Sequence, residues 1–102
     1  MPKIIWPEQP LRIREACDRH GVLLPADVAP LLALRTPPPM TAPVAKAFLR
    51  CTYAARDLER AERDLRGGGP QTEAFAARTL ARRVAALQRR LAALSSELAR
   101  SP

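Results

Sequence analysis

Residues 77–98 read ARTLARRVAALQRRLAALSSEL, and this stretch decides the fold of the chain. Its large apolar side chains follow one another at alternating intervals of four and three residues: Leu80, Val84, Leu87, Leu91, Leu94 and Leu98. Apolar residues that return about every 3.5 positions form one stripe along a helix, and such a stripe is stable only when it is buried against another helix. The sequence therefore predicts a long helix, from about Pro70 to Arg100, that packs along its length.

A second long helix is predicted from Pro43 to Arg66, where apolar side chains again recur at helical spacing. Between the two helices lies the run Gly67-Gly68-Gly69-Pro70, which breaks a helix. Two long helices joined by so short a break fold back on each other. Residues 43–102 are therefore predicted to form an antiparallel helical hairpin of coiled-coil type.

Two short helices and a proline-rich spacer are predicted within residues 10–42. The first helix spans about 10–20, and Gly21 is placed to end it. The second spans about 27–35, and its first residue, an aspartate, is a suitable N-cap. The run Thr36-Pro37-Pro38-Pro39 then stops that helix, because proline cannot donate a helical hydrogen bond.

Residues 1–9 are predicted to form an extended arm, since Pro2 and Pro7 oppose a helix there. The arm carries Ile5 and Trp6, and such apolar side chains are costly to leave in water. The arm either folds back over the helices of its own chain or docks on a partner, and the sequence leaves both alternatives open. Ile5 and Trp6 are therefore candidate partner-binding residues.

The composition indicates a single all-α domain of 102 residues. Apolar residues make up 47% of the chain but aromatic residues only 4%, so leucine, valine and alanine must form most of the core. At a rise of about 1.5 Å per residue, the last helix is about 45 Å long and its partner about 35 Å. Leu94 and Leu98 are thus expected to extend past the partner helix, where either the short helices or a second subunit covers them.

The chain is basic, with 17 Lys and Arg residues against 10 Asp and Glu residues and a net charge of +7. Five arginines of the predicted last helix are candidate nucleic-acid contacts: Arg78, Arg82, Arg83, Arg89 and Arg90. However, no aromatic side chains that could stack on bases are interleaved with them. Asp57, Glu59 and Glu62 are also expected to face part of this cluster across the hairpin, which favours a solvated or partly ion-paired face.

Few residues of the sequence have the side chains and spacing of a metal-binding or catalytic site. Cys17 and His20 have the spacing of a metal-binding pair and Cys51 is the other thiol, but a zinc site needs four ligands and the chain has one histidine. No nucleophile has a meaningful sequence relation to that histidine. We therefore expect two buried cysteines and a surface histidine, with no enzymatic activity, no metal and no cofactor.

The sequence also predicts where the protein works and how. Two cysteines are too few for a disulfide framework, and no apolar run is long enough for a membrane span or a signal peptide, which indicates a cytoplasmic protein or a part of a particle made there. We expect a non-enzymatic protein–protein interaction or assembly module, such as a small structural subunit of a larger oligomeric particle, a virion for example. The alternative is a basic nucleic-acid-binding protein that uses the arginines of the last helix. The residues expected to bind a protein partner or a second copy are Ile5, Trp6, Leu87, Leu91, Leu94 and Leu98.

Overall fold

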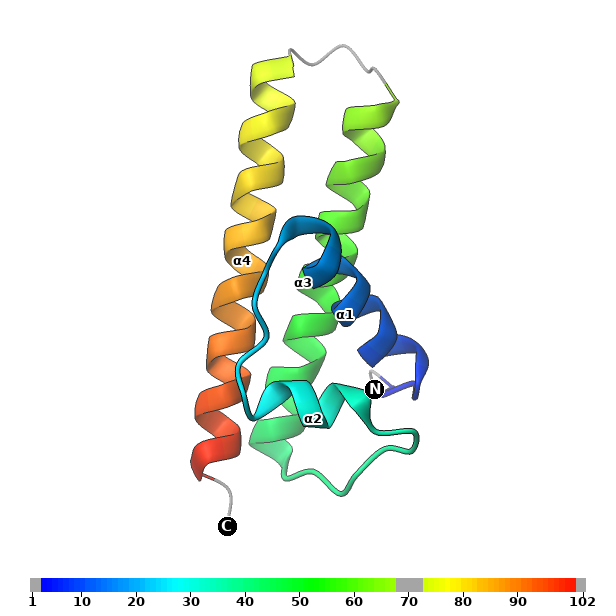
Figure 1. The fold of residues 1–102 in the computed structure, drawn as a ribbon, viewed down its shortest axis with the longest axis vertical. Coiled ribbons are helices and arrows are strands. Elements are labelled where there is room, and N and C mark those ends of the chain that lie inside the picture. Colours follow the sequence, from blue (N-terminus) through cyan, green and yellow to red (C-terminus); the bar gives the residue numbers. More distant parts are fainter. Residues whose placement is uncertain (1–2, 68–72, 101–102) are drawn as a thin grey trace.

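The computed structural model describes residues 3–67 and 73–100. Over these ranges the chain forms four α-helices: α1 (Glu8–His20), α2 (Val28–Ala33), α3 (Ala42–Arg66) and α4 (Glu73–Arg100). The long helices α3 and α4 run antiparallel, side by side, and the short helices lie against one side of them (Figure 1). The predicted all-α architecture, a long helical hairpin preceded by two short helices, is confirmed.

The leucine stripe of α4 lies at the centre of the hydrophobic core. Leu87, Leu91 and Leu94 are at most 1% exposed, and they share the core with residues of α3 such as Phe48 and Leu58. Full burial of one leucine side chain contributes about 2 kcal/mol to the free energy of unfolding. The stripe is less covered towards its ends, where its members are only partly buried: Leu80, Val84 and Leu98.

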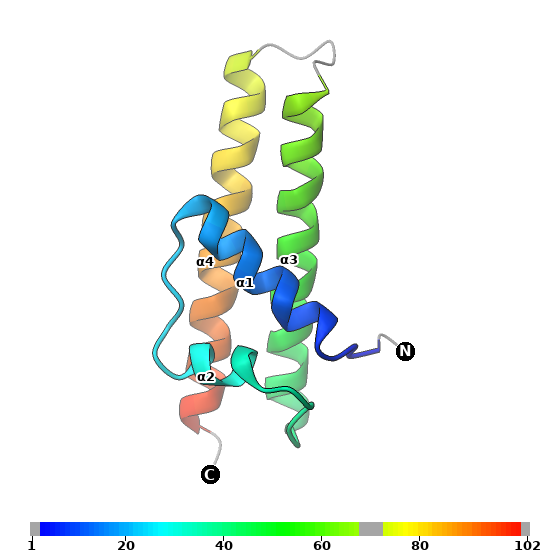
Figure 2. The ribbon, with the colours of Figure 1, turned by 45° about the vertical axis from the view of Figure 1, so that its right-hand side comes forward.

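The short helices cover one side of the hairpin. α1 crosses α3 obliquely and buries Ile13, Ala16 and Cys17, while α2 lies across the end of the hairpin and packs on α4 (Figure 2). Leu31 and Leu32 of α2 are buried in the same core as the leucine stripe. Leu94 and Leu98 do not extend past α3, contrary to the expectation, because Glu97 lies opposite Ala42 and Pro43 at the start of α3 and the two helices reach about the same level (Figure 1). The chain's own α2 packs on α4 at this end.

The extended arm is shorter than the sequence predicted, because α1 begins at Glu8 and not at Pro10. The side chain of Gln9 holds this early start in place: its Oε1 accepts a hydrogen bond from the Ile5 amide (2.8 Å), and its Nε2 donates one to the Lys3 carbonyl (3.2 Å). Pro10 remains inside the first turn, where it costs no hydrogen bond. Gly21 ends α1 as predicted, in the left-handed conformation with φ of 64°.

Asp27 does not cap α2 through its side chain, contrary to the prediction. Its Oδ1 accepts a hydrogen bond from Ser95 Oγ of α4 at 2.8 Å, so the carboxylate joins two helices that are distant in sequence. α2 is also shorter than the predicted 27–35, since Leu34 is already extended. The long helix α3 begins one residue before Pro43, with Thr41 as its cap.

The predicted start of the last helix at Pro70 falls outside the described residues, as do most of the glycine run and the first two residues of the arm. Within the described residues, Gly67 ends α3, and its amide donates to the Arg63 carbonyl at 2.8 Å.

Candidate interaction surfaces

The α4 leucines that were predicted to bind a partner are used by the fold itself. Leu87, Leu91 and Leu94 are enclosed by the chain's own helices, and Leu98 is partly buried against the same core. Their stripe therefore presents little apolar surface to a second protein.

The arm docks on its own chain. Trp6 stacks on Phe48 of α3 with ring centroids 5.4 Å apart and an interplanar angle of 29°. Its indole Nε1 donates a hydrogen bond to the Leu34 carbonyl at 2.8 Å. Ile5 beside it stays 45% exposed. Of the two alternatives that the sequence left open for Trp6, the structure has the intramolecular one.

The five arginines of α4 do not form one surface. Arg83 and Arg90 lie seven residues apart and line a hollow shared with α3. Arg78, Arg82 and Arg89 are exposed and, at about 100° per residue, lie on the side of α4 opposite the leucine stripe, and they do not line that hollow. Among the described residues, none of the five makes an ion pair or a hydrogen bond.

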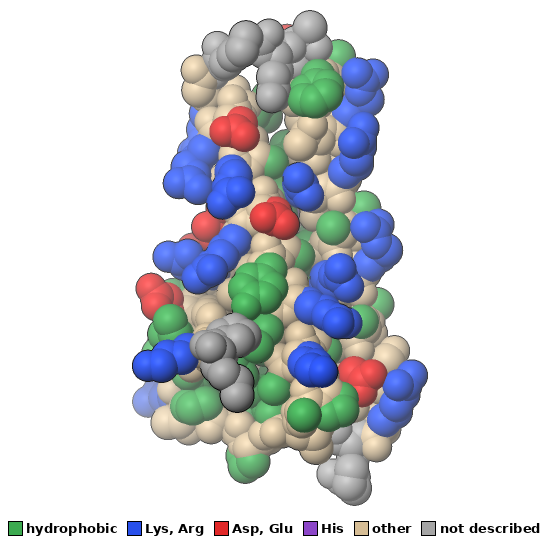
Figure 3. Space-filling view, turned by 180° about the vertical axis from the view of Figure 1, so that it is seen from behind, with side chains coloured by type: hydrophobic (Ala, Val, Ile, Leu, Met, Phe, Trp, Pro, Cys, Tyr) green, Lys and Arg blue, Asp and Glu red, His purple; other side chains and the backbone are tan. Residues whose placement is uncertain are grey.

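The hollow is part of a groove that runs between α3 and α4 on the face turned away from α1 and α2 (Figure 3). It has two parts, of about 310 Å³ and about 220 Å³, and Arg50 and Arg90 line both of them. We call this the α3–α4 groove. The larger part is lined by Ala42, Pro43, Lys46, Ala47, Arg50, Arg90, Ala93 and Glu97. The smaller part is lined by Arg50, Tyr53, Ala54, Asp57, Arg83, Ala86 and Arg90.

The α3–α4 groove has an alanine floor and charged walls. Alanines line it from both helices, Ala47 and Ala93 in the larger part and Ala54 and Ala86 in the smaller part, so the side chains there are no larger than a methyl group. Four cations and two acids line the walls: Lys46, Arg50, Arg83, Arg90, Asp57 and Glu97. One of the acids, Glu97, already pairs with Arg100 at 3.1 Å. The groove is therefore electropositive.

Glu62 is not turned to the α4 arginines, contrary to the expectation. Its carboxylate accepts hydrogen bonds from Arg19 Nε (3.0 Å), Arg19 Nη2 (3.1 Å) and His20 Nε2 (3.0 Å), all at the end of α1. Partial burial raises the pKa of Glu62, but the hydrogen bonds from His20 and Arg19 outweigh that effect and lower the pKa below its ordinary value. This cluster fastens α1 to α3, and it also accounts for His20, which contacts a carboxylate and not a thiol.

Cys17 and Cys51 are buried and free. Burial, together with the nearby charge of Asp18, raises the pKa of Cys17 to about 11. Burial, with a smaller contribution from Cys17, raises the pKa of Cys51 to about 12, and Arg90 acts weakly in the opposite direction. Over residues 3–67 and 73–100, no three His, Cys, Asp or Glu side chains are grouped so that they could hold a metal ion.

The spacing of alanines was the one signal for the groove in the sequence, and no alanine was among the predicted site residues. Ala47 and Ala54 are seven residues apart on α3, and Ala86 and Ala93 are seven apart on α4, so each helix has small residues on one side at the coiled-coil period. Lys46, Arg50 and Tyr53 were not among the predicted site residues.

In the described part of the chain, none of the helices has the length and apolar character needed to cross a membrane. Comparisons of the chain with protein-family models, curated proteins and solved structures found no match.

Proposed function

We propose that the chain is a non-enzymatic protein–protein interaction or assembly module that docks a partner protein in the α3–α4 groove. The observation that carries this proposal is the position of the groove, on the broad side of the hairpin that α1 and α2 leave uncovered. A small structural subunit of a larger particle, such as a virion, is one setting for such a module.

Two other candidate surfaces, the leucine stripe and Trp6, are already used within the chain. The leucine stripe lies in the core, and Trp6 is held by Phe48 and the Leu34 carbonyl. Tyr53, by contrast, is 43% exposed and lines the groove. A partly exposed aromatic side chain beside a hollow is typical of the anchoring positions of protein interfaces.

The test is position-specific crosslinking of the full-length chain in its native cells. A photo-crosslinking phenylalanine analogue replaces Tyr53, and in a control chain it replaces Leu23, which is 90% exposed in the segment between α1 and α2. We expect one protein, identified together with its crosslinked peptide by mass spectrometry, to be attached at position 53 and not at position 23. Equal crosslinking at both positions, or attachment of nucleic acid alone, would contradict the proposal.

A second candidate function, nucleic-acid binding, is supported by one observation. Arg78, Arg82 and Arg89 form an exposed outer stripe on α4 with no acidic partner among the described residues. Such a stripe would bind phosphates without sequence preference, and the affinity would fall steeply with salt. Fluorescence anisotropy with a labelled DNA duplex tests it: the triple change of these arginines to glutamine should abolish a salt-dependent signal, while Arg50→Gln should not.

A further inference from the structure

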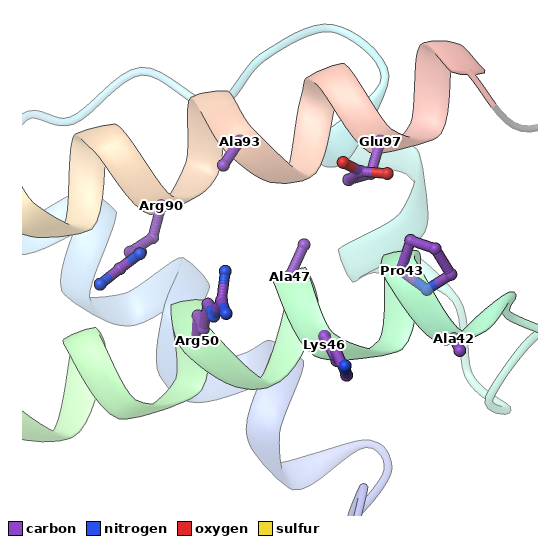
Figure 4. A pocket seen from close by; sticks show the side chains of 8 residues that line it. All are labelled: Ala42, Pro43, Lys46, Ala47, Arg50, Arg90, Ala93 and Glu97. Atoms are coloured by element: carbon purple, nitrogen blue, oxygen red, sulfur yellow. The ribbon is translucent and has the colours of Figure 1, made fainter.

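Arg50 and Arg90 occupy a special position in the α3–α4 groove. They come from opposite helices, and they are the two residues that line both parts of the groove. In Figure 4, Arg50 reaches from α3 and Arg90 reaches from α4 into the space between the helices. Within the described residues neither guanidinium has an ion-pair partner. Two like charges that face one hollow repel each other, and an anion bound between them would relieve that repulsion.

A carboxylate fits this arrangement well. Guanidinium groups bind carboxylates through two parallel, charge-assisted hydrogen bonds, and these are stronger than neutral hydrogen bonds. Lys46 and Arg83 extend the positive charge along the groove on either side of Arg50 and Arg90. A row of carboxylates on a ligand would therefore meet cations over much of the groove's length.

The floor of the groove fits a helix. The lining residues of α3 run from Ala42 to Asp57, which at about 1.5 Å per residue is about 22 Å, or about four helical turns. Alanine lines both sides of the floor at Ala47 and Ala93, so the backbone of a third helix can approach closely, as it does in small-residue helix packing. Tyr53 provides an aromatic contact at the edge.

We infer that the α3–α4 groove binds an acidic amphipathic helix of a partner protein, with Arg50 and Arg90 pairing with its carboxylates. This inference rests on the proposed function and specifies the partner's chemistry. The small and apolar side of the helix lies on the alanine floor, and its flanking Glu or Asp side chains face the walls. Arg50 and Arg90 determine the specificity for acidic helices.

Two other occupants of the groove, a second copy of this chain and a nucleic acid, fit less well than an acidic helix. A second copy of this chain would bring its own Lys46, Arg50, Arg83 and Arg90 against the same four cations, and the net charge of +7 would add to the repulsion. A nucleic acid would place phosphates against Asp57 and Glu97 and against an apolar floor. An acidic helix avoids both conflicts.

The test uses the full-length chain labelled with ¹⁵N and three probes. One probe is a synthetic 18-residue helical peptide with a Leu/Ala stripe flanked by glutamates. The second is the same peptide with lysine in place of every glutamate, and the third is a DNA duplex. We expect the glutamate peptide to shift the amide signals of α3 and α4 along the groove, and the lysine peptide to shift none.

Matched variants with equal charge changes locate the site. Arg50→Gln with Arg90→Gln should weaken binding of the glutamate peptide at least tenfold, whereas Arg82→Gln with Arg89→Gln, on the outer side of α4, should change it less than twofold. Arg50→Glu with Arg90→Glu should reverse the preference towards the lysine peptide. Circular dichroism checks that each variant keeps the helix content of the parent.

The outcomes separate this inference from the proposed function. Equal binding of both peptides in the groove would overturn the acidic specificity but leave the docking function in place. Equal losses in the groove and outer-side variants, or groove shifts caused by DNA and not by the glutamate peptide, would overturn the inference. If the glutamate peptide does not bind, the inference fails, and crosslinking at Tyr53 then decides independently whether the groove docks a protein.

Discussion

Trp6 and Phe48 stack on each other with their ring centroids 5.4 Å apart, although they are separated by most of the N-terminal half of the chain. Phe48, in the second turn of α3, is fully buried, and the partly buried Trp6 packs against the same core. The indole N–H donates to the Leu34 carbonyl, which lies just after α2. This one side chain therefore fixes the arm to α3 and to the end of α2 at once.

Replacing Trp6 should destabilise the whole fold, since the residue links three segments. Trp6→Ala removes the aromatic stack and the hydrogen bond and uncovers Phe48, and we expect it to lower the free energy of unfolding by about 2–3 kcal/mol. Trp6→Phe keeps most of the stack but loses the N–H donor, so its expected cost is about 1 kcal/mol. Urea denaturation followed by circular dichroism measures both. An unchanged midpoint for Trp6→Ala would mean that the arm does not dock in solution.

The leucine stripe should be the most sensitive part of the chain to truncation. Leu91 is 1% exposed, so Leu91→Ala leaves a cavity in the core and should cost about 2–5 kcal/mol. Leu23→Ala deletes the same atoms from a side chain that is 90% exposed, and its effect should stay within about 0.5 kcal/mol. Thermal melting of the two variants beside the parent protein makes the comparison. Similar melting temperatures for both variants would show that the stripe is not the core.

The hairpin could be predicted because its determinants are local in the sequence. The intervals of four and three residues in α4 and the run Gly67-Gly68-Gly69-Pro70 fix two long helices and the break between them, whatever surrounds them. The roles of Asp27 and Glu62 could not be predicted in the same way. Asp27 was expected to cap α2, and Glu62 was expected to face α4 across the hairpin. The fold instead places Asp27 next to Ser95 and Glu62 next to α1. Such pairings depend on how helices pack.

The groove was missed for a related reason. Alanines flank the leucine stripe, and the sequence alone does not say which flank α1 and α2 will cover. Once these helices pack on one side, the other flank becomes an open surface, which Arg83 and Arg90 line and Arg82 and Arg89 do not. A cluster of five arginines in the sequence is thus two surfaces in the fold.

Stability should depend on the ionisation of Glu62 at acidic pH. The pKa of Glu62 is lowered below its ordinary value of 4.5 in the folded chain, so folding favours the carboxylate form. The contribution of the ionised Glu62 to the free energy of unfolding is complete above about pH 5, and it is lost as the pH falls through the folded-state pKa. Glu62→Gln should therefore cost about 1 kcal/mol at pH 7, and the difference from the parent should shrink towards pH 3.

Denaturation at several pH values tests the role of Glu62, with Asp64→Asn as a control, because Asp64 is exposed and forms no ion pair with a described residue. The free energy of unfolding of Asp64→Asn should equal that of the parent at every pH. A constant difference between Glu62→Gln and the parent from pH 7 to pH 3 would show that the ion cluster does not act through the charge of Glu62.

The two thiols should be unreactive in the folded protein. Burial raises the pKa of Cys17 to about 11 and that of Cys51 to about 12, so at pH 8 both are almost entirely in the thiol form, whereas the reacting species is the thiolate. Burial also blocks the approach of a reagent. Ellman's reagent should therefore label neither cysteine of the native chain within minutes, but both in denaturant. A Leu23→Cys chain supplies the control, since a thiol at that exposed position should react at once and show that the reagent is competent. If Cys17 or Cys51 reacted as fast as the thiol at position 23, α1 would have to separate from α3 on the same timescale. The packing of α1 on the hairpin would then be less stable than the Arg19–Glu62 contact indicates.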